Sequence, residues 1–176
     1  MTLHINESEV QKLFTMPLAI EAVEKISKRQ AAGEVLVHPR KRFELPEGAF
    51  FHNMAAADLV GQLVATKQYT YVTGKLKFLV CLWSSGSGEL LAMIEADKMG
   101  QMRTGAASGV ATKYLARLDA ATAGIVGTGG QARTQLEAIA TVRKLNAVKV
   151  YGRNAERREK FASEMSSRLG ITVHAV

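Results

Sequence analysis

The sequence has 176 residues, a length that allows one domain or two small ones. With 47% apolar and 22% charged residues, a packed globular core is expected and disorder is not. The net charge of +7 admits a polyanionic partner, but no dense basic run interleaves with aromatic residues, so nucleic-acid binding is the weakest function considered. The single cysteine, Cys81, excludes an internal disulfide and favours a reducing compartment. Without a signal-peptide pattern or an apolar run of about twenty residues, a cytoplasmic protein with no membrane span is expected.

Helices are predicted early in the chain, after a short first strand. Asn6 or Ser8 can cap a helix that begins near Glu9, and Met16-Pro17 suits the start of a second helix, which Gly33 ends. Helical spacing places these residues on one face of the second helix: Leu18, Ala22, Ile26 and Arg29. His4 and His38 are isolated from other ligand-type residues, so no metal site is expected.

Alternating patterns in the next sixty residues predict a largely antiparallel sheet. The predicted strands are 35–46, 49–54, 63–72, 78–83 and 90–94. Turns are predicted at Pro46-Glu47-Gly48, at Gly74 and at residues 84–88.

Two features of these strands suggest an anion-binding site. Because side chains alternate along a strand, Arg40 and Arg42 share one face while Lys41 points to the other. Guanidinium groups bind carboxylates in bidentate fashion, so this face is either a carboxylate site or an ordinary solvated surface. Lys67 lies in an apolar strand, on the same face as Tyr69. It is either an edge residue with its ammonium group in water, or a cleft residue that binds an acid or transfers a proton.

A helix is predicted from 96 to 115, with the polar turn Arg117-Leu118-Asp119 after it. Its small residues at 105–109 permit close approach of another backbone or of a ligand. This helix links the mixed first part of the chain to a glycine-rich part. Arg103-Thr104 is therefore expected near the cleft between two domains, where small-molecule sites are common.

Residues 123–132 predict a dinucleotide-binding loop. An apolar run ending at Val126 leads directly into glycines with G-x-G-x-x-A spacing, and a helical pattern follows. Gly127 allows the tight turn, Gly129 lets the backbone approach a pyrophosphate, and Ala132 lets the helix pack on the strand. The first N–H groups of that helix favour a phosphate.

The residues after this loop complete a β-α-β-α-β pattern. A helix around 136–145, a strand at 147–151, a charged helix at 155–169 and a strand at 171–176 follow in order, with Gly170 as a helix stop. This is the mononucleotide-binding half of a doubly wound parallel sheet.

The end of the second strand of this pattern bears on the choice of cofactor. An acidic residue there would bind the ribose of NAD, but the chain has Gly152-Arg153-Asn154. Arg153 can pair with the 2′-phosphate of NADP, so NADP is favoured over NAD; the alternative is a solvent-facing arginine at the start of a helix.

Two segments together resemble the ornithine cyclodeaminase/mu-crystallin family. They are MRTGAASGVATKYL at 102–115 and GTGGQA at 127–132. The resemblance runs over residues 1–176 and corresponds to about the first half of a typical member. It implies an α/β fold: a mixed α+β substrate-binding and dimerisation domain at 1–116, then the first half of a Rossmann domain with a doubly wound parallel sheet at 117–176. It also implies a homodimer.

The resemblance also implies the site. Arg42 corresponds to a substrate-carboxylate arginine, Lys67 to the active-site lysine, and Arg103 to an arginine at the substrate and nicotinamide end. Many members have a threonine near the nicotinamide where this chain is expected to have Leu79. Cofactor contacts are expected at Thr104, Gly127, Thr128, Gly129, Gly130, Gln131, Ala132, Arg153 and Asn154.

The activity implied is that of an NAD(P)-dependent enzyme of amino-acid metabolism. Such an enzyme transfers a hydride at the α-carbon of an amino or imino acid, as a cyclodeaminase, an amino-acid dehydrogenase or a ketimine reductase. The main alternative is a non-catalytic protein that binds NADP or a small ligand, as mu-crystallin-like members can. Members also carry the second half of the Rossmann sheet. The sequence ending at Val176 is therefore expected to be a fragment, or to have an exposed sheet edge that another chain covers.

Overall fold

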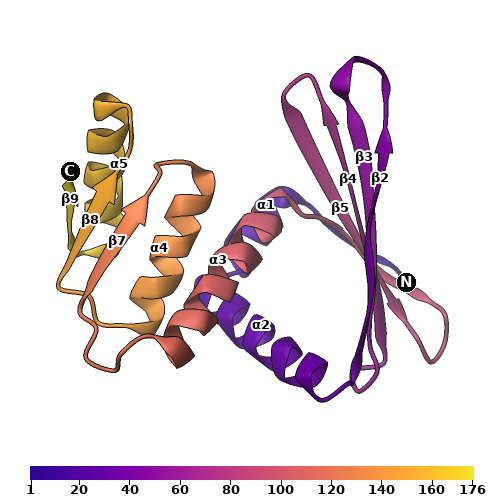
Figure 1. Ribbon diagram of the computed structural model, residues 1–176. Helices are drawn as coiled ribbons and strands as arrows, with labels where there is room; N and C mark the ends of the chain where they lie inside the picture. Colours follow the sequence, from indigo (N-terminus) through magenta and orange to yellow (C-terminus); the bar gives the residue numbers. More distant parts are fainter. The chain divides into compact units, whose positions relative to one another are not determined.

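A computed structural model describes all 176 residues (Figure 1). The chain forms two compact units, Met1–Phe14 with Lys25–Gly100 and Thr15–Glu24 with Gln101–Val176. One boundary between the two units falls inside helix α3 (Asp97–Leu115), at Gly100. Most of α3 belongs to the second unit because its small residues pack tightly against helix α4 (Gly130–Val142).

The first unit contains a six-stranded sheet with the order β1-β6-β5-β4-β3-β2. Neighbouring strands are antiparallel except β1 and β6, which are parallel, so the predicted largely antiparallel sheet is confirmed. A short turn, η1 (Pro46–Gly48), joins the second and third strands as predicted. The strands are β1 (Leu3–Ile5), β2 (Val35–Glu44), β3 (Phe50–Asp58), β4 (Leu63–Val72), β5 (Lys75–Ser84) and β6 (Leu90–Glu95).

Helix α1 (Glu7–Leu13) begins at the cap that the sequence suggested. The Asn6 side chain accepts hydrogen bonds from the N–H groups of Ser8 and Glu9, and the Glu9 carboxylate accepts one from the Asn6 N–H at 2.9 Å. This reciprocal pair satisfies donors that the helix itself leaves unpaired. The Glu7 carboxylate accepts hydrogen bonds from the first two N–H groups of α3, at 3.1 and 2.8 Å, and so fixes the start of that helix.

Helix α2 (Met16–Ala31) buries a different face from the one that carries Leu18 and Ile26. Its buried residues are Met16, Ala19 and Ile20, whereas Leu18 is 47% exposed and Ile26 is 36% exposed. The helix carries two apolar stripes, and its packing partner decides which one is buried. Ile20 lies beside Gly109 of α3, where the lack of a side chain leaves room for it.

The second unit confirms the β-α-β-α-β pattern. Strands β7 (Thr122–Val126), β8 (Ala147–Tyr151) and β9 (Thr172–Ala175) form a parallel sheet in that order, connected by α4 and α5 (Ala155–Leu169). Gly170 ends α5 in the left-handed conformation, at φ 65°. Both helices contribute to one hydrophobic cluster with the strands, in which these large side chains are fully buried: Leu136, Val148, Val150, Phe161 and Met165.

Small residues let α3 and α4 approach closely. A Cβ atom at Gly105 would lie 2.4 Å from the Thr134 carbonyl oxygen, and one at Gly109 would lie 3.1 Å from the Ala138 Cβ. Of the two explanations for the small residues at 105–109, close approach of another backbone is therefore confirmed for these two glycines.

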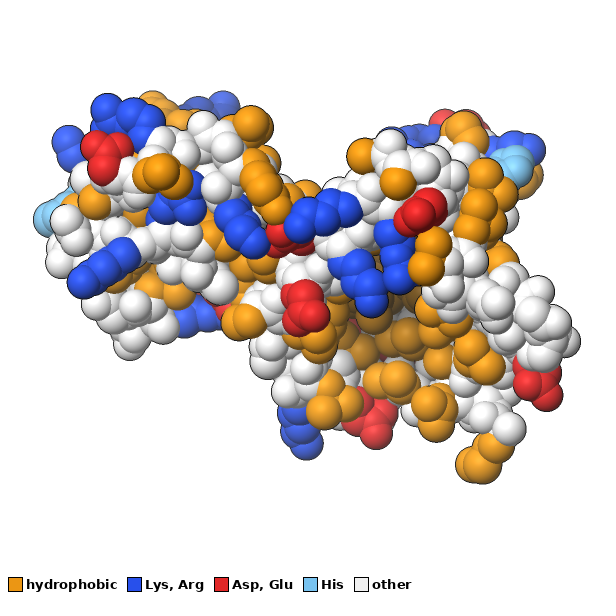
Figure 2. Space-filling view, turned by 90° about the horizontal axis from the view of Figure 1, so that it is seen from below, with side chains coloured by type: hydrophobic (Ala, Val, Ile, Leu, Met, Phe, Trp, Pro, Cys, Tyr) orange, Lys and Arg blue, Asp and Glu red, His pale blue; other side chains and the backbone are white.

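Several apolar side chains remain on the surface. Strand β7 pairs with β8 alone and so lies at an edge of the three-stranded sheet, and Val126 at its end is 87% exposed. Figure 2 shows apolar side chains over much of one face of the molecule, with Lys and Arg side chains at several separate places. In the first unit, the large apolar residues that are more than half exposed include Leu3, Leu36, Val37 and Phe43. None of the helices combines the length and apolar character needed to cross a lipid bilayer.

Candidate functional site

The glycine loop begins with a turn that requires glycine. Gly127 follows β7 and has φ 102°, a conformation that residues with a side chain rarely adopt. Its N–H donates a hydrogen bond to the Tyr151 carbonyl oxygen at 2.8 Å, which ties the loop to the end of β8. The prediction of a tight turn at Gly127 is confirmed.

Gly129 stands at the N-cap of α4 for a different reason. Its φ of −80° and ψ of −178° are ordinary extended values that any residue can adopt, and a Cβ atom there would meet nothing within 4 Å. Neither backbone strain nor packing within the protein therefore requires glycine. No side chain caps the first N–H groups of α4, so they remain available to an anion. Ala132 packs against the hydrophobic cluster below the loop, as predicted.

The turn after β8 lies beside this loop. A Cβ atom at Gly152 would come within 3.1 Å of the Thr128 methyl group, so the two loops are in close contact. Asn154 is the N-cap of α5, and its side chain accepts a hydrogen bond from the Arg157 N–H at 2.8 Å. The Asn154 side chain thus has a structural role, and Arg153 is exposed next to it.

Arg40 and Arg42 lie on one face of the sheet of the first unit. Arg40 donates a hydrogen bond to the Tyr69 hydroxyl at 3.2 Å, and the Arg42 guanidinium carbon lies 4.2 Å from the centroid of the Phe50 ring. Arg42 is also paired in bidentate fashion with Glu44, at 2.6 and 3.1 Å. Lys41 is opposite Asn53 on the other face. The predicted alternation is therefore confirmed. The Arg42 guanidinium group binds a carboxylate through two of its nitrogens, in the bidentate geometry considered for this face from the sequence.

Lys67 belongs to this same face. Strand β4 pairs with β3 on one side and β5 on the other, so the alternative of an edge lysine is wrong. The Lys67 ammonium lies 5.4 Å from the ring centroid of Tyr69 and 5.3 Å from that of Phe78. The electron-rich faces of aromatic rings attract a cation, so these two rings help to hold the Lys67 ammonium group in place.

Cross-strand register shows which side chain of β5 shares the face of Lys67. Leu79 is opposite Gln68, on the face away from Lys67, and the β5 residue opposite Lys67 is Val80. The side chain that shares the lysine's face is therefore Val80, because directly paired residues of a sheet lie on the same side.

His52 is a member of the cationic face that sequence reasoning missed. It is 5% exposed, and its Nδ1 forms a hydrogen bond with the Tyr69 hydroxyl, which also accepts the bond from Arg40. The Tyr69 hydroxyl has two lone pairs and one proton, so beside the bond from Arg40 it either accepts from Nδ1–H or donates to Nδ1, according to the imidazole tautomer. Nε2 is buried and has no partner in the protein. Strand alternation would have placed His52 beside Phe50, but only the pairing with β2 brings it to Arg42.

Protonation of His52 is disfavoured, and this predicts a pH dependence. Burial, followed by the positive charges of Arg40 and Arg42, lowers the pKa of His52 below 6.5. The unfolded chain therefore takes up this proton first as the pH falls, and the free energy of unfolding should decrease below about pH 6.5. An NMR titration should show a His52 midpoint below 6.5 that rises in Arg42→Gln. A midpoint at or above 6.5 would contradict the assigned surroundings.

Arg103 and Thr104 lie on α3, within the second unit. Arg103 is exposed, and Thr104 is half-buried one residue before the close contact at Gly105. Arg42 and Lys67 belong to the first unit, so the convergence of all three predicted cations stays a prediction.

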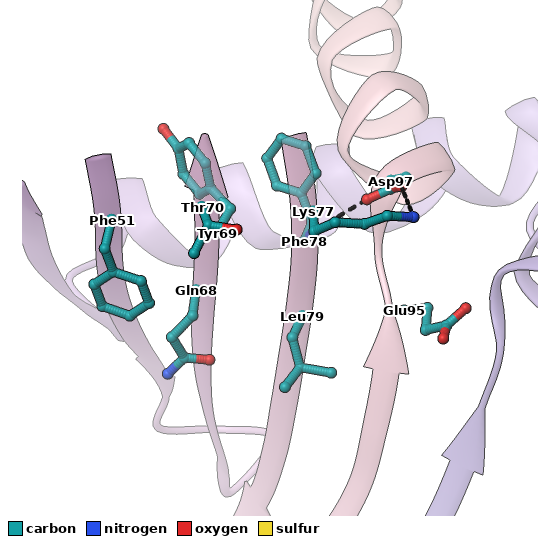
Figure 3. Close-up of a pocket in the computed structure, with 9 residues that line it drawn as sticks. All are labelled: Phe51, Gln68, Tyr69, Thr70, Lys77, Phe78, Leu79, Glu95 and Asp97. Atoms are coloured by element: carbon teal, nitrogen blue, oxygen red, sulfur yellow. Dashed lines mark hydrogen bonds and ion pairs between the residues drawn. The ribbon is translucent and has the colours of Figure 1, made fainter. Parts of the chain in front are cut away.

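A hollow of about 360 Å³ in the first unit is lined by Tyr69 and Phe78, the two rings beside Lys67 (Figure 3). Figure 3 shows Phe51, Gln68 and Leu79 on one side of the strands and the rings of Tyr69 and Phe78 on the other. None of the three predicted catalytic residues lines this hollow.

Arg133 is a second residue that sequence reasoning missed. From the first turn of α4 its Nη1 donates hydrogen bonds to the carbonyl oxygens of Thr128 and Gly129, at 3.1 and 3.2 Å. Its Nε and Nη2 donate to the Glu164 carboxylate at 2.8 and 2.6 Å. The only signal in the sequence is an arginine directly after Ala132, and its partner is thirty-one residues away.

Comparison with known proteins agrees with this geometry. The model of the ornithine cyclodeaminase/mu-crystallin family matches residues 2–176. An alanine dehydrogenase from Archaeoglobus fulgidus is 32% identical over 171 residues, which cover 95% of this chain and 53% of that protein.

Two solved structures are also similar to this chain. One is the Δ(1)-pyrroline-2-carboxylate reductase of Thermococcus litoralis in complex with NADH and L-proline. It has a TM-score of 0.91 and 36% identity, with 99% of this chain and 57% of that chain covered. The other is an archaeal alanine dehydrogenase dimer with bound NAD. It has a TM-score of 0.92 and 31% identity, covering 99% of this chain and 56% of that chain.

The chain thus spans about half the length of the curated relative and of the solved structures described above. Over that length the family match includes both the cationic sheet and the glycine loop. The protein belongs to the ornithine cyclodeaminase/mu-crystallin family.

Proposed function

We propose that the glycine loop at 127–132 binds the pyrophosphate of a nicotinamide dinucleotide. The observation that carries this proposal is Gly129, which has ordinary backbone angles and open space where its side chain would be. A glycine that the protein itself does not need is explained by a ligand that must come close to the backbone. The uncapped start of α4 supplies N–H donors and a partial positive charge to that ligand. The relatives solved with NADH and with NAD support the same choice.

The substrate we propose is an amino or imino acid bound at the cationic face of the first unit. In this structure the Arg42 guanidinium group binds the Glu44 carboxylate in bidentate fashion. A substrate carboxylate can be bound in the same geometry. A substrate carboxylate would replace Glu44 there. The names of the relatives mention alanine, proline and pyrroline-2-carboxylate, and each of these compounds carries such a carboxylate.

Hydride transfer at the α-carbon of that substrate is the reaction we propose. A bound reduced nicotinamide would supply the hydride to a carbon–nitrogen double bond, and the nitrogen then needs a proton. Lys67 lies on the same sheet face as Arg42, so its ammonium group is the candidate to bind near the reacting nitrogen or to deliver that proton. The protein would thus be an NAD(P)-dependent enzyme of amino-acid metabolism.

An assay of nicotinamide absorbance tests this function directly. The protein with NADPH or NADH is given cyclic imino acids, or keto acids plus ammonia, and oxidation of the cofactor is expected. Ornithine and lysine are tested in parallel, because a cyclodeaminase releases ammonia without net consumption of cofactor. Tight cofactor binding without turnover of any of these compounds would instead support a mu-crystallin-like binding protein, and the absence of cofactor binding would reject both functions.

Arg153 predicts the preference between the two cofactors. Replacing it with aspartate removes the charge proposed to pair with the 2′-phosphate of NADP and introduces a ribose-binding carboxylate, so the affinity ratio should move toward NADH by about tenfold or more. Calorimetric titration of both cofactors measures the ratio. Lys160→Asp makes the same change in net charge farther along α5 and should leave the ratio unchanged. An equal shift in both variants would mean that net charge, and not Arg153, sets the preference.

We also propose a homodimer formed through the first unit. Leu36, Val37 and Phe43 on β2 are each more than half exposed, an unusual loss of hydrophobic burial for a strand. The dimeric alanine dehydrogenase supports this arrangement. Sedimentation equilibrium should give twice the 19.1 kDa chain mass, and Phe43→Glu should shift the equilibrium to the monomer.

A further inference from the structure

Two carbonyl groups of the glycine loop accept hydrogen bonds from one side chain. Arg133 donates to the Thr128 oxygen at 3.1 Å and to the Gly129 oxygen at 3.2 Å. In a trans peptide unit the N–H points opposite to the C=O. The two units that contain these carbonyls therefore direct the N–H groups of Gly129 and Gly130 away from Arg133. These are N–H groups at the start of α4 that the helix cannot satisfy.

Arg133 is itself held from the other side. Glu164 of α5 accepts two hydrogen bonds from it, at 2.8 and 2.6 Å, and the guanidinium carbon lies 5.3 Å from the centroid of the buried Phe161 ring. The hydrogen bonds from Arg133 lower the pKa of Glu164, so both partners stay charged near neutral pH. With the ion pair and the ring fixing its position, the guanidinium group is a rigid anchor for the loop.

We propose that Arg133, fixed by Glu164, is a positioning residue that sets the Gly129 and Gly130 N–H groups in the orientation that receives a dinucleotide pyrophosphate. This inference rests on the proposed function, because it assigns a role within the same cofactor site. Without the anchor, the peptide units at 128–130 can rotate, and the loop must be ordered each time a ligand binds. That ordering reduces affinity without removing any contact to the ligand.

The chain contains a matched control. Arg168 and Glu137 form a second ion pair between the same two helices, α5 and α4, but Arg168 has no hydrogen bond to the glycine loop. Losing either pair removes one link between α4 and α5. Only the loss of Arg133 also releases the loop carbonyls.

The experiment compares Arg133→Met, Arg133→Lys and Arg168→Met by calorimetric titration with NADH and with ADP, alongside urea unfolding. Arg133→Met should weaken binding of both ligands about tenfold, and Arg168→Met should bind within twofold of the unmodified protein at a similar loss of stability. Arg133→Lys keeps a charge for Glu164 but cannot donate in the same fork, so it should recover stability without recovering affinity.

The outcomes separate this inference from the function on which it rests. If the unmodified protein binds NADH and Arg133→Met binds it equally well, the positioning role is rejected and the cofactor site remains. If Arg133→Lys recovers affinity together with stability, the role of Arg133 is structural only. If the unmodified protein binds neither NADH nor ADP, the proposed function fails and the role of Arg133 fails with it.

Discussion

Replacing Gly105 with alanine should lower the free energy of unfolding by roughly 2 to 3 kcal/mol, in the upper part of the range for over-packed sites. The added methyl group would lie 2.4 Å from the Thr134 carbonyl oxygen, and this neighbour is backbone that cannot swing aside. Helices α3 and α4 would have to separate, which also loosens the fully buried Thr134 and Ala138. The shift of the urea unfolding midpoint, followed by circular dichroism, measures the loss.

Gly100 provides the control within the same helix. A Cβ atom there would meet nothing within 4 Å, and its backbone is helical. Gly100→Ala should therefore stabilise the protein by about 0.5 to 1 kcal/mol through the lower entropy of the unfolded chain. If Gly105→Ala is as well tolerated as Gly100→Ala, the close contact between α3 and α4 is wrong.

Replacing Gly129 with aspartate should abolish most dinucleotide binding while the protein stays folded. The backbone angles at Gly129 suit any residue, its side-chain position is open, and aspartate is a favourable N-cap. The carboxylate would occupy the place proposed for the pyrophosphate. A like charge at that distance costs several kcal/mol, which corresponds to a loss of affinity of about a hundredfold or more.

Gly129→Asn separates the effect of charge from that of bulk. Asparagine has the same shape as aspartate and is an equally good N-cap, so it should bind NADH more weakly than glycine does but much better than aspartate. Fluorescence titration with NADH measures the three affinities, and urea unfolding checks that all three proteins are equally folded. Unchanged affinity in the aspartate variant would place the pyrophosphate elsewhere.

Local patterns in the sequence predicted most of the fold. Alternation identified strands β2 to β6, and the order of strand, glycine loop and helix identified the β-α-β-α-β unit. Such features depend on residues close together in the chain, such as Asn6 with Glu9, or Gly170 after the last turn of α5. Turn and cap chemistry is therefore readable without knowing the tertiary neighbours.

The errors came from features that depend on partners far apart in the sequence. Strand β3 runs to Asp58, four residues beyond its predicted end. The additional residues include three alanines, which have a low strand propensity, but they form strand because they pair with β2 on one side and β4 on the other. Such pairing depends on the register of the partner strands, which residue spacing does not reveal.

The same difference between local features and distant partners applies to the candidate site. The backbone conformation requires glycine at 127 alone in this loop, and that turn could be predicted from the sequence because it depends on local geometry. His52 and Arg133 act through Tyr69 and Glu164, which lie seventeen and thirty-one residues away, and no local pattern joins them. Residue patterns singled out Arg42, Lys67 and Arg103, the family resemblance assigned their roles, and those roles stay predictions.

The backbone amide spectrum of the loop gives the most direct test of the cofactor site. At 19.1 kDa the protein is suited to two-dimensional NMR with nitrogen-15 labelling. On addition of NADPH or NADH, the amide signals of Gly129, Gly130 and Gln131 should move the most, and ADP should move the same three signals. Gly48 and Gly74, in turns of the first unit, should stay in place. Saturable binding that leaves the loop amides unmoved, or no binding at all, would contradict the account.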